Sequence, residues 1–157
     1  MEQTEKIMKF FLVTGKMEKQ VAKLKSLYMK KFGLNGSDLP ILFVLMTEPE
    51  GCRQDRLSAM TGSDKAQISR SISRLMDKGM ISKEDSSLYK SRYSLTEKGR
   101  KAADDLAAIA SQVFDEAHSV LDDEQWEGFY DFLERLNSQI ARMIEIQETQ
   151  KNSFKEE

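Results

Sequence analysis

The chain has 157 residues, of which 39% are hydrophobic and 32% charged, and its formal net charge at pH 7 is −2. A chain of this length buries roughly two-thirds of its unfolded surface, so it needs no disulfide or metal to fold. Its one cysteine excludes an internal disulfide and a cysteine-rich metal site. No apolar run approaches the roughly 20 residues that cross a bilayer, and the acidic N-terminus is unlike a signal peptide. We therefore expect a cytoplasmic protein with no membrane partner.

The small net charge conceals a strong asymmetry along the chain. Residues 1–36 and residues 62–101 each carry a net charge of +5, whereas residues 102–157 carry −10. One part of the molecule can therefore approach a polyanion that another part repels. Ordinary solvated surfaces account for the same numbers, so charge alone leaves a nucleic-acid partner open.

Two helices are predicted before the centre of the chain. Apolar residues at three- and four-residue spacing predict a long helix over residues 5–32, which Gly33 ends. A second helix runs through residues 41–46 and is apolar on nearly all sides, which is typical of a buried helix. Ser37 is predicted to cap it, with Pro40 in its first turn.

A short helix over residues 53–61 and a tight turn precede a more polar helix. Asp64 is predicted to be the N-cap of this helix, and Gln67 fits the third position of a capping box. Gly79 is predicted to end it. This order of elements is typical of a helix-turn-helix.

The second half of the chain begins with a predicted hairpin. Residues 80–83 and 91–95 read as two strands. Thr96 is predicted to cap a long helix. The acidic residues 122–124 are predicted to start the last helix, where their charge suits the positive end of the helix dipole. We expect residues 151–157 to form a flexible tail.

A helix-turn-helix followed by a hairpin is the layout of a winged helix, which places its second helix in the major groove of DNA. Glutamine pairs with adenine and arginine with guanine through two hydrogen bonds, so Gln67 and Arg70 are candidate base readers. The capping box gives the Gln67 amide a competing role. Other polar residues suit phosphates. The predicted contacts from this helix are Asp64, Lys65, Ala66, Gln67, Ser69, Arg70, Ser73 and Arg74.

The hairpin supplies a second set of candidate contacts. Lys83, Lys90 and Arg92 can bring positive charge to the minor groove or its phosphates. The alternative is a surface hairpin that only closes the domain.

Apolar stripes on the first and last helices are larger than one small winged helix needs, so they must be buried elsewhere. A bundle within one chain is one solution. A two-fold dimer is favoured because a second DNA-reading subunit engages a second half-site. The predicted dimer contacts are Ile7, Phe10, Phe11, Trp126, Phe129, Leu133, Leu136, Ile140 and Met143.

Other chemistry finds little support. Cys52 lies beside Arg53, which can lower a thiol pKa, so a redox switch is an alternative role. The only histidine, His118, lies near several aspartates, but an acidic helix end explains these better than a metal site does. No nucleophile–base set, phosphate loop or dinucleotide motif is present. We therefore predict no enzyme activity, no cofactor and no metal.

The central segment resembles the MarR (multiple antibiotic resistance regulator) family. The resemblance depends on Gly62, the run from Asp64 to Arg70, Leu75, the run Lys-Gly-Met-Ile over residues 78–81, and the ending Leu-Thr-Glu-Lys-Gly over residues 95–99. It is clear over residues 34–99 and looser over the flanking helices. At the wing tip the family often has Asp-x-Arg, where this chain has Ser87, Leu88 and Tyr89.

The resemblance implies a homodimer built from the first and last two helices of each subunit. It implies binding to a pseudo-palindromic operator, usually as a repressor. It also implies a small, often aromatic ligand that loosens DNA binding from a pocket between the dimerisation region and the winged helix. The pocket residues remain unknown from the sequence.

The sequence thus predicts a mainly α fold with a small β-hairpin wing. Residues 1–36 and 100–150 are predicted to form the dimerisation region, and residues 37–99 the DNA-binding domain. The predicted function is sequence-specific regulation of transcription, with double-stranded DNA, a second copy of the chain and a small aromatic or lipophilic effector as partners. The alternative is a helical protein–protein interaction module without DNA reading.

Overall fold

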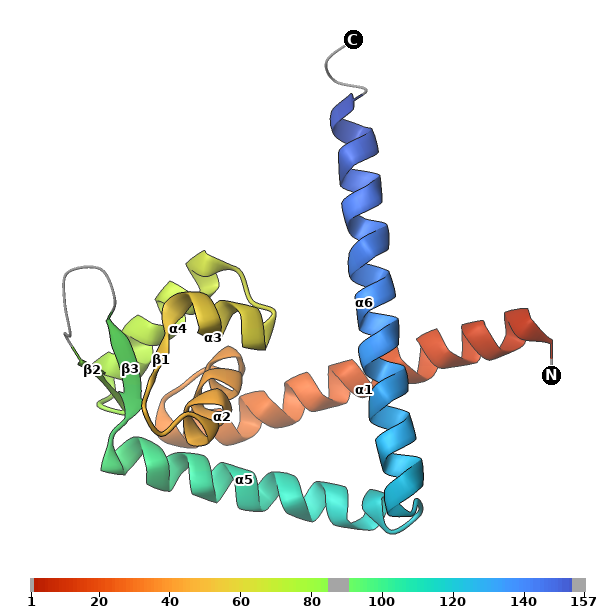
Figure 1. Cartoon of the computed structure of the whole chain (residues 1–157). Coiled ribbons are helices and arrows are strands. Elements are labelled where there is room, and N and C mark those ends of the chain that lie inside the picture. Colours follow the sequence, from red (N-terminus) through yellow and green to blue (C-terminus); the bar gives the residue numbers. More distant parts are fainter. Residues whose placement is uncertain (1, 85–90, 154–157) are drawn as a thin grey trace. The chain divides into compact units, whose positions relative to one another are not determined.

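The computed structural model describes residues 2–84 and 91–153 and divides into two compact units, Met1–Ala110 and Ser111–Glu157 (Figure 1). The fold is mainly α-helical with one small antiparallel sheet, as the sequence predicts. In the described part of the chain, no helix combines the length and apolar content that a membrane crossing requires.

The first unit begins with the long predicted helix. Helix α1 spans Gln3–Met29 and continues into a 3-10 turn, η1, over Lys30–Phe32. Gly33 ends it in the left-handed region at φ 67°, a conformation that costs glycine little. Only Met29 of α1 is fully buried, so most of this helix is solvent-accessible.

The second helix starts differently from the prediction. A 3-10 turn, η2, spans Gly36–Asp38, and α2 follows over Leu39–Thr47 with Pro40 in its first turn. The N-cap of this segment is Asn35, whose backbone N–H donates to the Asp38 carboxylate at 2.9 Å. The prediction that Ser37 is the cap is wrong, because Ser37 already lies inside the turn.

The helix-turn-helix is formed as predicted. Helix α3 spans Gln54–Thr61 and ends at Gly62, whose φ is 68°. Helix α4 spans Lys65–Asp77 and is followed by Gly79, also with positive φ.

The sheet contains one strand that the sequence does not reveal. Strands β2 (Ile81–Glu84) and β3 (Arg92–Leu95) form the hairpin, and β1 (Cys52–Arg53) pairs with the other edge of β3, giving the order β1-β3-β2. Cys52 lies opposite Tyr93. A strand of two residues is too short to show an alternating pattern, which is why it escapes prediction.

One hydrophobic core holds the elements of the first unit together. It takes apolar side chains from every helix of the unit and from β1 and β2. Its buried members are Met29, Leu34, Leu39, Ile41, Leu42, Leu45, Cys52, Leu57, Ile68, Ile72, Leu75, Met80, Ile81, Ala102, Ala103 and Leu106.

Helix α5 (Glu97–His118) is fixed to the hairpin at its first turn. The Thr96 hydroxyl oxygen accepts a hydrogen bond from the Gly99 N–H at 3.0 Å, which confirms the prediction that Thr96 is the N-cap of this helix. The Thr96 N–H donates to the Met80 carbonyl, also at 3.0 Å. A Cβ at position 99 would overlap that carbonyl, so this close approach requires glycine.

The second unit consists of the end of α5 and helix α6, over Asp123–Ser153. Asp122 and Gln125 form a reciprocal capping box at the start of α6, with distances of 2.8 and 3.0 Å. The Trp126 indole stacks on the His118 ring at 5.0 Å between centroids, and its Nε1–H donates to the His118 carbonyl. His118 thus closes the turn between the two helices.

Candidate nucleic-acid interface

Helix α4 is anchored by one face. Ile68, Ile72 and Leu75 are buried in the core, and Ser71 is fully buried between them. These positions recur every three or four residues, so they form one side of the helix. The helix is therefore held by apolar packing, and its opposite side is available for other contacts.

The exposed side of α4 is polar and carries positive charge. Lys65, Ala66, Ser69, Arg70 and Ser73 are all exposed. The Ser73 hydroxyl donates to the Ser69 carbonyl at 3.0 Å, so it must release this bond before it can donate to a phosphate. Arg70 has no such internal engagement among the hydrogen bonds and ion pairs of the described residues, which leaves its guanidinium available for a base edge.

The N-terminus of α4 forms only one half of the capping box. The Asp64 carboxylate accepts the Gln67 backbone N–H at 2.7 Å, which confirms Asp64 as the N-cap. Within the described chain, no hydrogen bond joins the Gln67 amide to Asp64. The Gln67 side chain, half-buried at the helix edge, is therefore not held by the cap.

Arg74 does not face outward as predicted. Its Nε donates to Asp38 Oδ2 at 3.1 Å and its Nη2 to Asp38 Oδ1 at 2.7 Å. The Asp38 side chain has no exposed surface, and hydrogen bonding to it raises the pKa of Arg74 above its ordinary value. We therefore withdraw Arg74 from the predicted DNA contacts, because its charge is already paired inside the protein.

Sequence reasoning missed Asp38 and Ser71 as partners of Arg74. At about 100° per residue, Ser71 falls on the apolar face of α4, and Arg74 lies about 60° further round, at the edge of that face. A serine on a buried face beside an arginine was the available signal. Asp38 is 36 residues away in the sequence, so no periodicity could have identified it.

The base of the wing is described, but its tip is not. Lys83 lies opposite Tyr93 and Glu84 opposite Arg92 in the β2–β3 ladder. Lys83 and Arg92 are exposed, as a phosphate contact requires. The third predicted contact, Lys90, and the departure from the family pattern at residues 87–89 lie outside the described residues.

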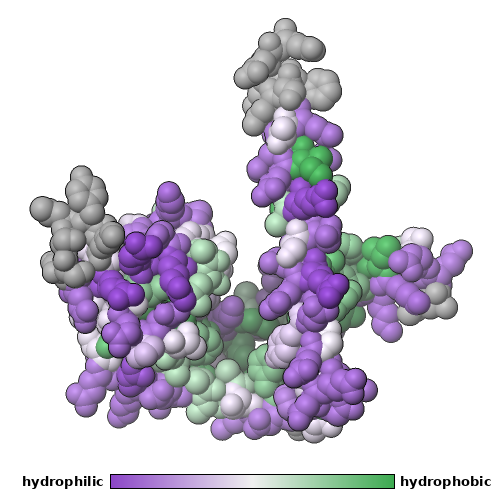
Figure 2. All heavy atoms as spheres, in the orientation of Figure 1, coloured by the Kyte–Doolittle hydropathy of each residue, from purple (hydrophilic) through white to green (hydrophobic). Residues whose placement is uncertain are grey.

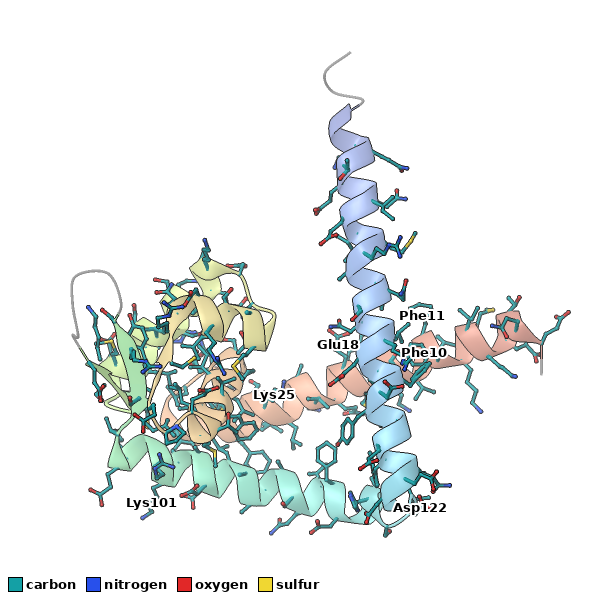
Figure 3. All side chains as sticks on the ribbon, viewed as in Figure 1. Phe10, Phe11, Glu18, Lys25, Lys101 and Asp122 are labelled. Carbon is teal, nitrogen blue, oxygen red and sulfur yellow. The ribbon has the colours of Figure 1, made fainter. Side chains whose placement is uncertain are left out.

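A hollow of about 620 Å³ lies beside the N-terminus of α4. Its walls come from α1, η2, the first turn of α2, the turn before α4 and the first turn of α4. Gln67 lines it together with Lys25, Ser37 and Ser63. Lys25 and Glu18 project from α1 in Figure 3. The apolar part of the wall comprises Met17, Val21, Ala22 and Pro40.

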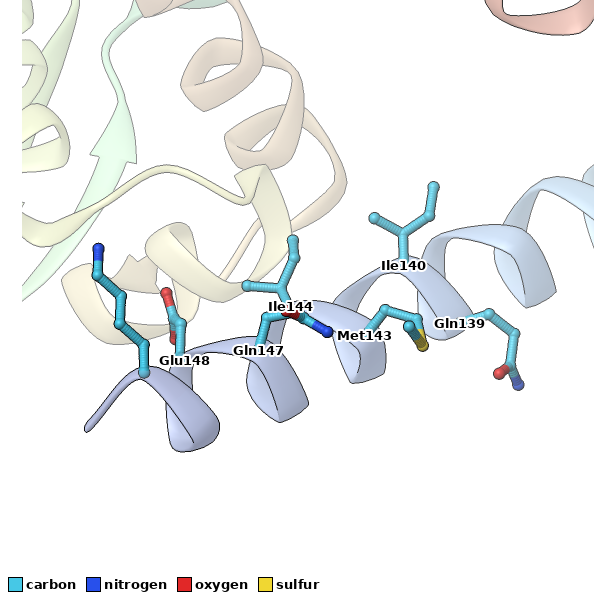
Figure 4. Close-up of a pocket in the computed structure, with 7 residues that line it drawn as sticks. Gln139, Ile140, Met143, Ile144, Gln147 and Glu148 are labelled. Carbon is cyan, nitrogen blue, oxygen red and sulfur yellow. The ribbon is translucent and has the colours of Figure 1, made fainter. Parts of the chain in front are cut away.

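Long apolar faces remain uncovered on α1 and α6. Phe11 is 61% exposed and Met143 55%, and both belong to the predicted dimer contacts. Figure 2 shows hydrophobic residues among the polar surface of both helices, and Figure 4 shows Ile140, Met143 and Ile144 along α6. The other exposed large apolar residues of the two helices are Ile7, Met8, Leu12, Val13, Met17, Val21, Leu27, Phe129, Tyr130, Phe132 and Ile146.

Cys52 does not have the environment of a redox switch. Its side chain is buried in the core at β1. Burial is the main cause that raises the pKa of its thiol above the ordinary value of 9.0, and the Glu48 carboxylate adds to this. The Arg53 carbonyl, which accepts a hydrogen bond from the thiol, lowers the pKa as the smallest of the causes. The pKa is raised overall, contrary to the expectation, and the thiol stays protonated at neutral pH.

The helix-turn-helix, the small sheet and the exposed polar face of α4 define a winged-helix protein. Residues 32–88 match the model of the MarR family. Over these residues the chain is similar to the MarR family of transcriptional regulators, as its sequence motifs indicate.

Solved structures of similar proteins share this fold. A MarR transcriptional regulator from Methanosarcina mazei is 26% identical, with a TM-score of 0.62 over 83% of this chain and 98% of its own. A MarR protein from Peptoclostridium difficile is 17% identical, with a TM-score of 0.72 over 83% and 86%. Staphylococcus aureus MepR, in a complex with DNA, is 15% identical, with a TM-score of 0.71 over 83% and 97%. No curated protein matches the chain.

Proposed function

We propose that this chain is a homodimeric repressor that reads a pseudo-palindromic operator through α4. The observation that carries the proposal is the orientation of α4. Ile68, Ile72 and Leu75 fix one face in the core, and the opposite face presents Lys65 and Arg70 to solvent. The complex of the similarly folded MepR with DNA supports this role. A regulator of this kind acts where the DNA is, which we propose is the cytoplasm.

Within α4 we assign different tasks to different residues. Arg70 and Gln67 contact base edges, since each can form two hydrogen bonds to one base. Lys65, Ser69 and Ser73 contact phosphates and set the register. Asp64 and Ala66 lie at the start of the helix, where Asp64 orients the first turn through its bond to Gln67.

A binding experiment at two salt concentrations tests this proposal. A labelled duplex from the DNA upstream of the chain's own gene and a scrambled duplex are titrated at about 50 and 200 mM salt, where each phosphate contact contributes about 0.9 to the salt slope. Arg70→Ala should cost about 1–3 kcal/mol of operator affinity and relax specificity at one base pair. Equal operator affinity of the wild type and Arg70→Ala refutes the assignment of Arg70.

The same experiment separates the proposal from a helical interaction module. The uncovered faces of α1 and α6 suit either function, because both functions bury apolar helices against a partner. A module without DNA reading shows no preference for the upstream duplex and no steep salt dependence. If the chain shows neither a preference for the upstream duplex nor a steep salt dependence, the interaction module is supported and DNA reading by α4 is not.

We propose that the uncovered faces pair with a second copy of the chain. Residues 1–36 and 100–150 then form the dimerisation region, and residues 37–99 the DNA-binding domain. Because Ile140 is 44% exposed in the single chain, Ile140→Asp leaves the fold intact but places a charge in the dimer contact. Sedimentation should show a monomer for Ile140→Asp and a dimer for the control Ser138→Asp, whose exposed position lies on the opposite side of α6. A wild type that is monomeric at micromolar concentration contradicts the proposal.

The hollow beside α4 is our candidate for the effector site. Its apolar wall suits an aromatic or lipophilic body, and Lys25 suits an acidic group. A ligand there touches Gln67, one of the proposed base readers, and should therefore weaken operator binding. Benzoate and an uncharged benzene derivative, tested by thermal shift, show whether the acidic group matters, and Lys25→Gln is the control that removes its partner.

A further inference from the structure

Arg74 and Asp38 form a two-point ion pair that joins α4 to η2. The Arg74 Nε and Nη2 groups each donate to a separate oxygen of the Asp38 carboxylate, at 3.1 and 2.7 Å. The Arg74 side chain is 32% exposed and the Asp38 side chain is fully buried. Paired, parallel hydrogen bonds of this kind fix an angle as well as a distance.

Further hydrogen bonds hold both ends of the pair. The backbone N–H of Asn35 donates to the Asp38 carboxylate at 2.9 Å, so this end is fixed to the turn before α2. Arg74 Nη2 also donates to the Ser71 hydroxyl at 3.0 Å and lies 3.5 Å from the Ser37 hydroxyl. In the described chain, no buried side-chain N or O atom lacks a hydrogen-bond partner.

The apolar anchors of α4 and this ion pair restrain different motions. Ile68, Ile72 and Leu75 fix how deeply α4 sits in the core, because apolar packing opposes the opening of a gap but has no preferred direction. The ion pair fixes rotation of α4 about its own axis. An arginine tip lies about 9 Å from that axis, so a rotation of about 10° moves the tip of Arg70 by about 1.5 Å. That displacement exceeds the range over which a hydrogen bond to a base forms.

We propose that Arg74 and Asp38 are positioning residues, which set the rotation of α4 so that Gln67 and Arg70 meet the base edges. Neither residue contacts DNA. This inference rests on the proposed DNA reading by α4 and goes beyond it, because it assigns part of the sequence preference to a pair within the protein.

The alternative role, a phosphate contact by Arg74, predicts the opposite sign for one substitution. If Arg74 contacts DNA, Asp38→Asn frees the Arg74 charge from its ion pair and removes the negative charge of Asp38, so DNA affinity rises. If the pair positions α4, Asp38→Asn weakens the restraint and operator affinity falls. The two roles are thus separated by the direction of a single change.

The experiment measures operator and scrambled-duplex affinities for the full-length wild type, Asp38→Asn and Arg74→Lys. Arg74→Lys keeps the charge but cannot form the two-point pair. We expect each variant to lose about tenfold in the ratio of operator to scrambled affinity, about what one bidentate base contact contributes. The salt slope should stay unchanged, because no phosphate contact is lost.

The exposed ion pair Arg135–Asp131 on α6 provides a matched control, since Asp131→Asn makes the same chemical change at a pair 2.8 Å long. This control should keep the wild-type ratio. All affinities are measured below the temperature at which circular dichroism detects unfolding, and if Asp38→Asn does not fold, Arg74→Lys decides alone. A ratio unchanged in the variants, or an affinity that rises in Asp38→Asn, overturns the inference. A wild type that shows no operator preference overturns the proposed function instead.

Discussion

Replacing Gly99 with alanine should destabilise the first unit by about 3 kcal/mol. Gly99 lies in the first turn of α5, where its Cα approaches the Met80 backbone so closely that a Cβ would overlap the Met80 carbonyl. This carbonyl accepts the Thr96 N–H at 3.0 Å and lies 3.1 Å from the Thr96 hydroxyl. The carbonyl cannot move away without breaking those contacts, so the start of α5 must shift instead.

The magnitude follows from the contacts that such a shift disrupts. Loss of two hydrogen bonds costs about 1–3 kcal/mol in the free energy of unfolding. Forcing an extra methyl group into a packed site costs about 1–3 kcal/mol more. Alanine recovers at most about 1 kcal/mol, because it favours a helix more than glycine does. The middle of the resulting range is about 3 kcal/mol.

Urea denaturation followed by circular dichroism measures this change. Gly128→Ala is the matched control, because nothing lies within 4 Å of a Cβ built at that position inside α6. It should stabilise the chain by about 0.5–1 kcal/mol, which is the ordinary effect of glycine in a helix interior. A loss below about 1 kcal/mol for Gly99→Ala would show that the α5 start is not locked against Met80.

Three further outcomes follow from the same structure. Burial raises the pKa of the Cys52 thiol in the folded chain above 9.0, so the thiol of the unfolded chain loses its proton at a lower pH than the thiol of the folded chain. The free energy of unfolding should therefore fall as the pH rises above about 9. Urea denaturation at a series of pH values should show a smaller fall for Cys52→Ala. Gln67→Ala should lower operator affinity by about 1–3 kcal/mol and leave the salt slope unchanged in the duplex titration at two salt concentrations, whereas a changed slope would indicate a phosphate contact. Lys83→Ala combined with Arg92→Ala should reduce the salt slope by up to about 1.8, and an unchanged slope and affinity would show that the base of the wing does not touch DNA.

The fold was predictable wherever short-range signals agreed. Asp64 and Gly79 mark the two ends of α4 because capping and positive φ are properties of one or two residues. Thr96 and Gly99 belong to the Leu-Thr-Glu-Lys-Gly motif of the sequence, and the structure supplies its physical reason, which is the approach of α5 to Met80. Strand β1 could not be predicted, since its two residues become a strand only when they pair with β3.

The candidate site was predictable in outline only. Periodicity correctly separated the buried Ile68 and Ile72 from the exposed Arg70. The exposure of residues at the boundary between the two faces is harder to predict, because a side chain at that angle of the helix can point either toward the core or toward solvent. The Arg74 side chain points inward because it pairs with the buried Asp38 carboxylate, whereas Arg70 has no carboxylate partner among the described residues.

The order of hydrophobic and polar residues by itself determined the helices, the hairpin and the side of α4 that meets solvent, because each depends on neighbours within a few residues. Only the tertiary structure decided which charged side chains are paired within the protein and which remain free to contact a partner. Asp38 comes from a turn 36 residues before Arg74, and it takes that arginine out of the contact surface by pairing with it. Burial of Cys52 likewise depends on packing from several elements, and it keeps the thiol protonated whatever residue stands beside it in the sequence.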